Sequence, residues 1–157
     1  MADTKSLAMH FPDTDERELP DLGLPFAFVS VFERWLSEEE CAFSRTMTYS
    51  IALEAGEIEG YLEGERKFFD LYRALGKVGM IVGWPQPIRR VEVETAEFEG
   101  ILRDSLREQN LMDVYFEGYG VRIRGGYDRT DVIIADSVEQ LSALELEVRR
   151  SGLFMLR

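Results

Sequence analysis

A hairpin near the C-terminus is the sequence feature that most constrains the fold. Apolar and polar residues alternate over residues 114–124 and again over 131–135, and a period of two is typical of β-strands. The segment between them, Gly125–Thr130, opens with two glycines and suits a tight reversal of the chain. Because an isolated two-stranded hairpin is only marginally stable in water, we expect Leu153–Leu156 to form a further strand beside one of the two.

Helices are predicted on both sides of this hairpin. Residues 57–76 and 94–109 carry apolar side chains at the helical period. Ser137 begins a third helix, which ends in two arginines at Arg150, where positive charge suits the helix dipole. The C-terminal part is therefore expected to follow the order α-β-β-α-β, with a small antiparallel sheet.

The N-terminal half is predicted to be mainly helical, which makes the fold class α+β. Residues 24–36 are strongly apolar and fit either a helix or a strand, and Ser37 and Glu40 have the spacing of a capping box. Residues 45–54 also fit both, and a helix is favoured over a strand. Residues 1–22 are rich in acids and proline, so we expect a flexible acidic arm ahead of a single domain at 23–157.

The negative charge lies almost entirely in the first part of the chain. Of a formal net charge of −12, residues 1–65 carry −11 (15 acids, 4 bases) and residues 66–157 carry −1 (15 acids, 14 bases). Such an asymmetry indicates a directed electrostatic face or an acidic arm. The acidity argues against nucleic acid and anionic membranes as partners, since both are bound through lysine and arginine. The acidity favours a basic partner. Alternatively, the negative charge only keeps the protein soluble.

Residues for the common catalytic and metal sites are scarce. The chain has one histidine, His10, and one cysteine, Cys41, which are too few for a structural zinc site. A Ser-His-Asp triad would have to use His10, which lies in the expected arm and is poorly placed for catalysis. Asp13 and Asp15 form a D-x-D pair without the other ligands of a calcium loop. The G-x-G at Gly118–Gly120 lies in a predicted strand with no helix after it, unlike a nucleotide-binding loop. We therefore expect no enzyme activity, no cofactor and no bound metal.

The expected location is the cytoplasm. The first residues contain no apolar segment of the kind that directs secretion, and no apolar run approaches the ~18 residues of a transmembrane helix. A single cysteine cannot form an internal disulfide, which suits a reducing compartment.

Two surface features are candidate partner-binding sites. The first is a ladder of acids whose spacing brings like charges together on a helix, as on a surface that a partner neutralises: Glu54, Glu57, Glu59, Glu63 and Glu65. The second is the hairpin tip at Tyr127, Asp128 and Arg129, because tyrosine and arginine often anchor interfaces. Simpler interpretations are a solvated helix face and a tip in which Arg129 pairs with Asp128 or Asp131.

In general type, an acidic single domain of this kind resembles the bacterial immunity proteins, which neutralise a cognate toxin. The resemblance is carried by the charge of residues 1–65 and by Glu57, Glu59, Glu63 and Glu65. It implies a basic protein partner, a toxin domain, held on an acidic surface.

Two alternatives stay open at this point. An α+β ligand-binding domain or enzyme could bind an anionic small molecule through Arg122, Arg124, Tyr127 and Arg129. A regulatory subunit that acts as a homo-oligomer would also fit this composition.

Overall fold

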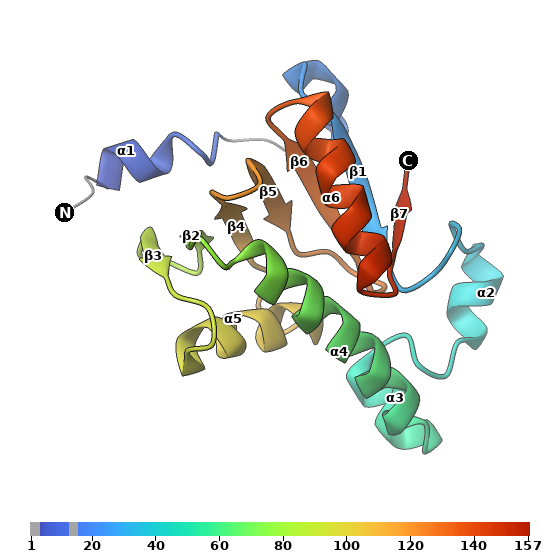
Figure 1. The fold of residues 1–157 in the computed structure, drawn as a ribbon. Helices are drawn as coiled ribbons and strands as arrows, with labels where there is room; N and C mark the ends of the chain where they lie inside the picture. Colours follow the sequence, from blue (N-terminus) through green and yellow to red (C-terminus); the bar gives the residue numbers. More distant parts are fainter. Residues whose placement is uncertain (1–3, 13–15) are drawn as a thin grey trace.

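The structure is a computed structural model that describes residues 4–12 and 16–157, with the backbone alone at 16–18. Within these residues, a seven-stranded antiparallel sheet with the order β3-β2-β4-β5-β6-β1-β7 forms the centre of the molecule (Figure 1). The fold is therefore mixed α+β, as predicted. The strands are β1 (Phe26–Ser30), β2 (Met80–Trp84), β3 (Arg89–Val91), β4 (Asp113–Phe116), β5 (Val121–Arg124), β6 (Thr130–Ala135) and β7 (Phe154–Leu156).

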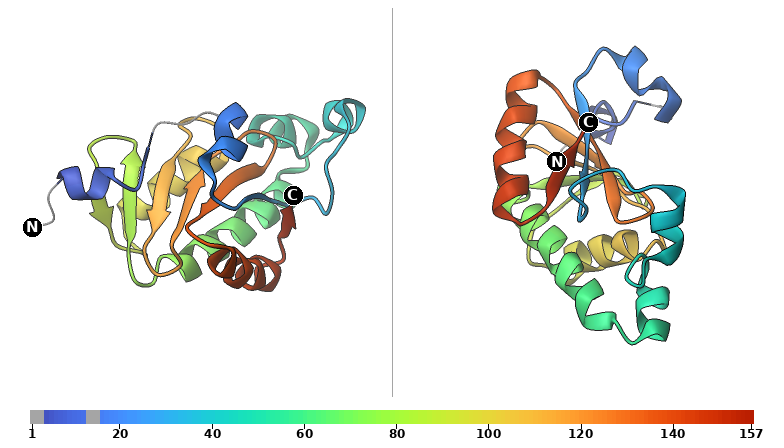
Figure 2. Two further views of the ribbon diagram at one scale, coloured as in Figure 1. Left: turned by 90° about the horizontal axis from the view of Figure 1, so that it is seen from above. Right: turned by 90° about the vertical axis from the view of Figure 1, so that its right-hand side faces the viewer.

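Three helices, α4 (Ile58–Leu75), α5 (Ala96–Leu106) and α6 (Val138–Arg150), pack on one face of the sheet and cover the main hydrophobic core (Figures 1 and 2). All three were expected from their apolar periodicity. The core is rich in aromatic side chains, which bury the largest apolar areas. Among its fully buried members are Phe68, Tyr72, Phe98 and Phe116.

The opposite, outer face of the sheet is covered in part by the N-terminal segment. Helix α1 (Thr4–Ala8) places the buried Leu7 in a small cluster with residues of β2 and β4. The 3₁₀ helix η1 (Glu16–Leu22) places the buried Leu19 against two apolar side chains of β6. The N-terminal segment therefore contributes to the burial of the outer face.

The predicted acidic arm, residues 1–22, is described in two pieces, 4–12 and 16–22. Residues 1–3 and 13–15, the latter with the predicted D-x-D pair, lie outside the described residues. The division into a flexible arm and a single domain stays a prediction.

Two short helices, α2 (Glu38–Phe43) and α3 (Tyr49–Ala55), follow β1 and project beyond the sheet, at the right of Figure 1. The predicted capping box is present, because Ser37 Oγ accepts from Glu40 N at 3.1 Å and Ser37 N donates to Glu40 Oε1 at 3.1 Å. Helix α3 confirms the preference for helix over strand in the second half of residues 45–54.

The predicted hairpin is present, with one correction. Residues 114–124, expected as a single strand, form the end of β4 and all of β5, joined by a turn. Gly120 in that turn has φ +61°, which an extended strand residue does not adopt, and this explains the break. Strands β5 and β6 then pair through the Gly-Gly connection. A Cβ at Gly126 would lie 2.2 Å from the Thr130 carbonyl oxygen, so this position needs glycine.

The predicted partner of the last strand is wrong. Leu153–Leu156 does contain a strand, β7, but it pairs with β1 and not with a strand of the hairpin. Strand β1 lies between β6 and β7, so that Phe28 faces Val132 on one side and Leu156 on the other. Its odd-numbered Ala27 and Val29 enter the main core, which its alternating pattern allows.

Within the described residues, the N-terminal half contains α1, η1, α2, α3 and α4 and a single strand, so helices predominate there but do not fill it, and the sheet is larger than expected. Strand β1 lies inside that half, and β2 begins just after it. The C-terminal part has the order α5-β4-β5-β6-α6-β7, with one strand more than predicted. The reason is physical: short apolar segments fit a buried strand and a buried helix equally well, so pairing across the sheet decides between them.

Candidate functional site

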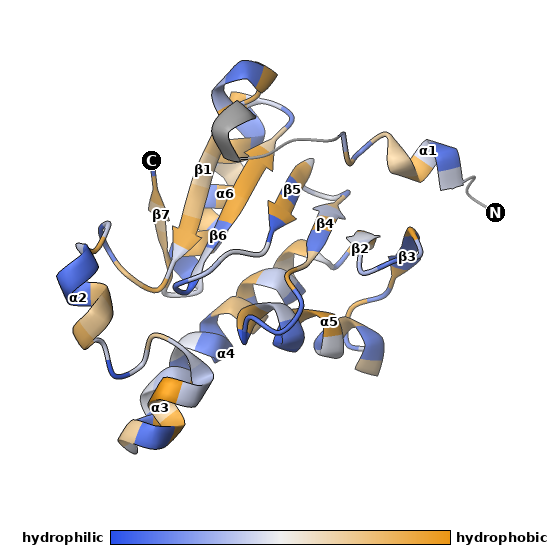
Figure 3. Cartoon of the chain, turned by 180° about the vertical axis from the view of Figure 1, so that it is seen from behind, coloured by the Kyte–Doolittle hydropathy of each residue, from blue (hydrophilic) through white to orange (hydrophobic). Residues whose placement is uncertain are grey.

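A groove of about 400 Å³ lies on the outer face of the sheet, opposite α4, α5 and α6. We call it the outer groove. Side chains from β1, β6 and β7 form its floor, and the loop after β1, helix α2 and the β5–β6 turn form its walls. Figure 3 shows how the backbones of β1, β6 and β7 lie relative to α2. Its lining is mainly apolar and consists of Phe28, Ser30, Phe32, Arg34, Trp35, Leu36, Cys41, Gly126, Tyr127, Asp128, Thr130, Val132 and Leu156.

Two aromatic side chains of the groove are unusually exposed. Trp35 is 51% exposed and Tyr127 is 66% exposed. The indole of Trp35 contacts Phe28 edge-on, with ring centroids 4.9 Å apart, and its Nε1 donates to the Arg157 carbonyl at 3.3 Å. Trp35 is thus held in place while half of its surface faces solvent. Large apolar side chains in this condition often mark interaction sites.

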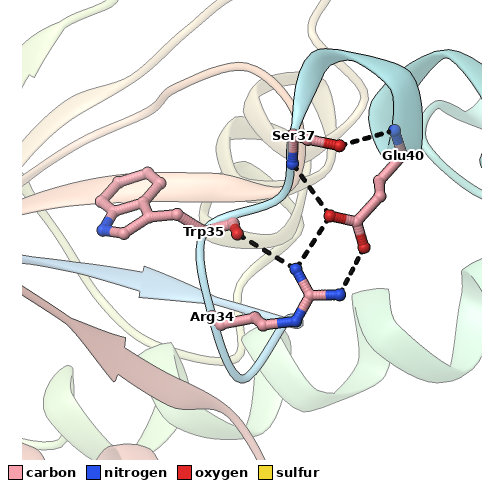
Figure 4. A network of polar contacts seen from close by, with 4 residues as sticks. All are labelled: Arg34, Trp35, Ser37 and Glu40. Carbon is pink, nitrogen blue, oxygen red and sulfur yellow. Dashed lines mark hydrogen bonds and ion pairs between the residues drawn. The ribbon is translucent and has the colours of Figure 1, made fainter.

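The wall formed by the loop after β1 is fixed by a polar network (Figure 4). The two terminal guanidinium nitrogens of Arg34 donate to the carboxylate of Glu40, Nη1 at 2.9 Å, and Nη1 also donates to the Trp35 carbonyl at 3.3 Å. The hydrogen bond from Arg34 lowers the pKa of Glu40 to about 2. The positive charge of Arg34 is therefore neutralised within the wall.

The wall formed by the β5–β6 turn has a strained backbone. Asp128 and Arg129 both have φ +58°, a left-handed conformation that is costly for residues other than glycine. The turn is closed by Thr130 N, which donates to the Tyr127 carbonyl at 3.2 Å. It is tied to the segment just after α5 by Asp128 N, which donates to Glu108 Oε1 at 2.8 Å. These contacts hold the turn in one conformation beside the groove.

Arg129, predicted as an interface anchor, points into the protein. Its Nη2 donates to the Tyr61 carbonyl at 2.7 Å, its Nη1 donates to the Thr46 carbonyl at 3.2 Å, and the guanidinium lies 4.5 Å from the Tyr61 ring centre. Burial lowers the pKa of Arg129. The guanidinium fits because residue 64 is glycine, where a Cβ would lie 2.0 Å from Nη2. Arg129 therefore positions the turn, and it does not pair with Asp128 or Asp131.

A buried pair of polar side chains supports the turn from the core side. Asp131 is 2% exposed, and its carboxylate accepts from Tyr72 Oη at 2.5 Å and from Gly126 N at 3.0 Å. Burial raises the pKa of Asp131 to about 6 and the pKa of Tyr72 well above its usual value. This pair was not predicted, and its only signal was an acid within an otherwise apolar strand.

Next to the outer groove, residues 33–65 form a projection that we call the acidic lobe, which comprises the end of the loop after β1, α2, α3 and the start of α4 (Figure 1). It contains 9 acids and 2 bases. Large apolar side chains are also exposed here, among them Phe43 at 77% and Leu53 at 57%. Six of its acids have no ion pair within the described part of the chain: Glu33, Glu38, Glu39, Glu54, Glu59 and Glu63.

Four residues of the predicted acidic ladder lie on the surface, and the fifth is buried. Glu54, Glu57, Glu59 and Glu63 are exposed, and Glu57 lies 3.9 Å from Arg45. Glu65 is 7% exposed and is held by Arg107 of α5, whose Nε and Nη2 donate to its carboxylate at 2.8 and 3.0 Å. Glu65 therefore joins two helices and is not part of the surface.

The arginines considered for an anion site do not converge. Arg122 donates to both carboxylate oxygens of Asp113, at 2.8 and 2.6 Å, and to the Pro12 carbonyl at 3.0 Å. Arg129 binds carbonyls near α3 and α4, as described above. Arg124 has one buried nitrogen, Nη1, without a hydrogen-bond partner in the described residues. Tyr127 is exposed on the turn.

His10 and Cys41 have separate surroundings. The His10 ring stacks on Tyr115 with centroids 4.1 Å apart, and the half-buried thiol of Cys41 lines the outer groove. Within residues 4–12 and 16–157, no cluster of three or more histidine, cysteine, aspartate or glutamate side chains has a metal-binding arrangement. In the same residues, no helix combines the length and apolar character that crossing a membrane requires.

The acidic lobe and the outer groove are thus the two surface features that suggest binding. Comparison with family models, curated proteins and solved structures found no match to this chain.

Proposed function

We propose that this chain is a protein-binding module that captures a basic protein on the acidic lobe. The observation that carries the proposal is the set of six exposed, unpaired carboxylates on one projection, interspersed with exposed apolar side chains. Opposite charges accelerate association and fix orientation, and apolar contacts then slow dissociation. The carboxylates of the lobe supply the charge for fast association, and its exposed apolar side chains supply the contacts that slow dissociation.

The kind of partner we propose is a bacterial toxin domain, whose basic working surface the lobe would cover. The charge of the lobe, 9 acids against 2 bases, supports an immunity-type role. Such a protein acts by occlusion and needs no catalytic group of its own. The cytoplasm is the proposed location, and the single cysteine, which forms no disulfide, is compatible with it.

The proposal is tested with three baits used side by side. The first is the native chain, the second carries Glu54→Lys, Glu59→Lys and Glu63→Lys, and the third carries the control set Glu92→Lys, Asp104→Lys and Glu139→Lys. All six positions are exposed, so the two sets change the net charge equally at different places.

We expect a basic protein in lysates of the source organism to bind the native and control baits but not the lobe variant. Co-production of the native chain should also relieve any toxicity of that protein in a test host. The proposal fails if the same proteins bind all three baits equally.

A further inference from the structure

We infer that the outer groove receives one large apolar side chain, presented by a lysine- or arginine-rich segment of the partner. The inference rests on the proposed function and adds to it the place where the partner is anchored. It follows from the apolar floor of the groove, from the hydrogen bonds that already occupy its hydroxyl groups and its arginine, and from the carboxylates around it.

The hydroxyl groups of Ser30 and Thr130 and the guanidinium of Arg34 already have partners within the groove. Thr130 Oγ1 lies 2.9 Å from Ser30 Oγ, and Ser30 Oγ also accepts from Phe32 N at 3.1 Å. Arg34 is occupied by Glu40 and by a carbonyl. Few polar groups are therefore free to recognise an anion or a sugar, whereas the floor of Phe28, Val132 and Leu156 gains from covering by an apolar group.

Carboxylates without ion pairs lie in and beside the groove. Its one cationic lining residue, Arg34, is paired, whereas the lining carboxylate of Asp128 has no ion pair within the described residues. Glu33 beside the groove and Glu38 on the helix that walls it are also exposed and unpaired. An apolar side chain with cationic neighbours in its own chain fits this combination of apolar floor and acidic rim.

The apolar surface extends further than a small molecule in the groove could cover. Trp35 and Tyr127 are more than half exposed, and Phe43 on the walling helix is 77% exposed. A polypeptide segment can place one side chain in the groove and cover the aromatic rim with its flanking residues. Buried anchors surrounded by such a rim are typical of protein interfaces.

Cys41 provides the test, because it is the only thiol of the chain and lines the groove. Its rate of alkylation by iodoacetamide is measured with the full chain and four probes. These are a peptide with tryptophan between two pairs of lysines, the same peptide with alanine for tryptophan, a version with glutamates for lysines, and free tryptamine.

We expect the lysine–tryptophan peptide to slow alkylation saturably, by about tenfold when bound, because an occupied groove denies the reagent access to the thiol. The other three probes should slow it far less. Equal protection by the alanine peptide, by the glutamate peptide or by free tryptamine would overturn the inference. The inference would also be overturned if none of the four probes slowed the alkylation of Cys41.

Two tryptophan variants provide a matched control. Trp35→Ala should abolish the protection, whereas Trp84→Ala, which changes an exposed tryptophan outside the groove, should preserve it. Protection that survives Trp35→Ala counts against the inference. The outcome is independent of the bait experiment: capture that depends on the lobe, without protection of Cys41, keeps the proposed function and removes the groove as its anchor.

Discussion

Asp131 is a carboxyl group placed where water hardly reaches it, between the Tyr72 hydroxyl and the Gly126 amide. Both partners donate, so the ionised form is well bonded, yet burial outweighs them and raises the pKa to about 6 from the usual 3.8. The folded chain therefore binds a proton at this site more tightly than the unfolded chain does. Its contribution to stability is complete below about pH 4 and is lost as the pH rises through 6.

Replacement of Asp131 by asparagine removes this titration. Relative to the Asp131→Asn variant, we expect the native chain to lose about 2–3 kcal/mol of unfolding free energy between pH 4 and pH 7. Urea unfolding of both proteins across that range measures the difference, and groups that titrate in both proteins cancel. A difference that stays constant with pH contradicts the assignment.

Two glycines of α4, Gly60 and Gly64, differ in the space that surrounds them. Gly64→Ala places a Cβ 2.0 Å from Arg129 Nη2, so the guanidinium must leave its two carbonyl acceptors. We expect a loss of about 1–3 kcal/mol in unfolding free energy. Gly60→Ala meets only an ordinary contact of 3.5 Å and should gain up to about 1 kcal/mol, because alanine favours helix. Thermal or chemical unfolding measures both effects. Equal effects of the two substitutions would show that the Arg129 guanidinium can leave its carbonyl acceptors without loss of stability.

Helices α4 and α5 are joined by the ion pair between Glu65 and Arg107, whose side chains are 8% and 20% exposed. The carboxylate hydrogen bond raises the pKa of Arg107. A charge left without its partner at such a site is costly, whereas removal of both charges costs much less. The guanidinium also lies 4.2 Å from the Tyr49 ring of α3, so three helices meet at this residue.

Arg107→Met is therefore expected to destabilise the chain by about 2–4 kcal/mol. Adding Glu65→Gln to it should recover part of that loss, so the double mutant should be more stable than the sum of the single effects predicts. Chemical unfolding of the four proteins in the cycle measures the coupling. Strictly additive effects would mean that the two side chains do not stabilise the contact between the helices.

The longer helices could be predicted because their signals are local. The apolar period of each is intact, and Thr95 and Ser137 cap their helices through bonds to Phe98 N and Gln140 N, both at 3.2 Å. The place of β1 could not be predicted in this way. Its five residues become the second strand from one edge only through pairing with β6 and β7, at least 100 residues further along the chain.

For the whole molecule, the charge asymmetry could be predicted from composition, and the structure turns it into a surface. The acidic lobe carries −7 (9 acids, 2 bases) of the −11 charges of residues 1–65, although Glu65 is buried inside the fold. The outer groove could not be predicted, because its residues come from 28–41, 126–132 and 156. Only the insertion of β1 between β6 and β7 brings these three segments together.

If the acidic lobe steers a basic protein toward the chain, the association rate constant must depend on the charge of the lobe. It is measured by stopped flow with the partner captured by the native bait, using the native chain, the lobe variant and the control variant. The measurements are repeated at 0.1 M and 1 M salt, between which the Debye length falls from about 10 Å to about 3 Å.

We expect the lobe variant to associate about tenfold or more slowly than the native and control chains at low salt, and the three rates to converge at high salt. Dissociation should change less. Association rates that are equal for the lobe and control variants at low salt would contradict the claim and reduce the lobe to a solvated surface.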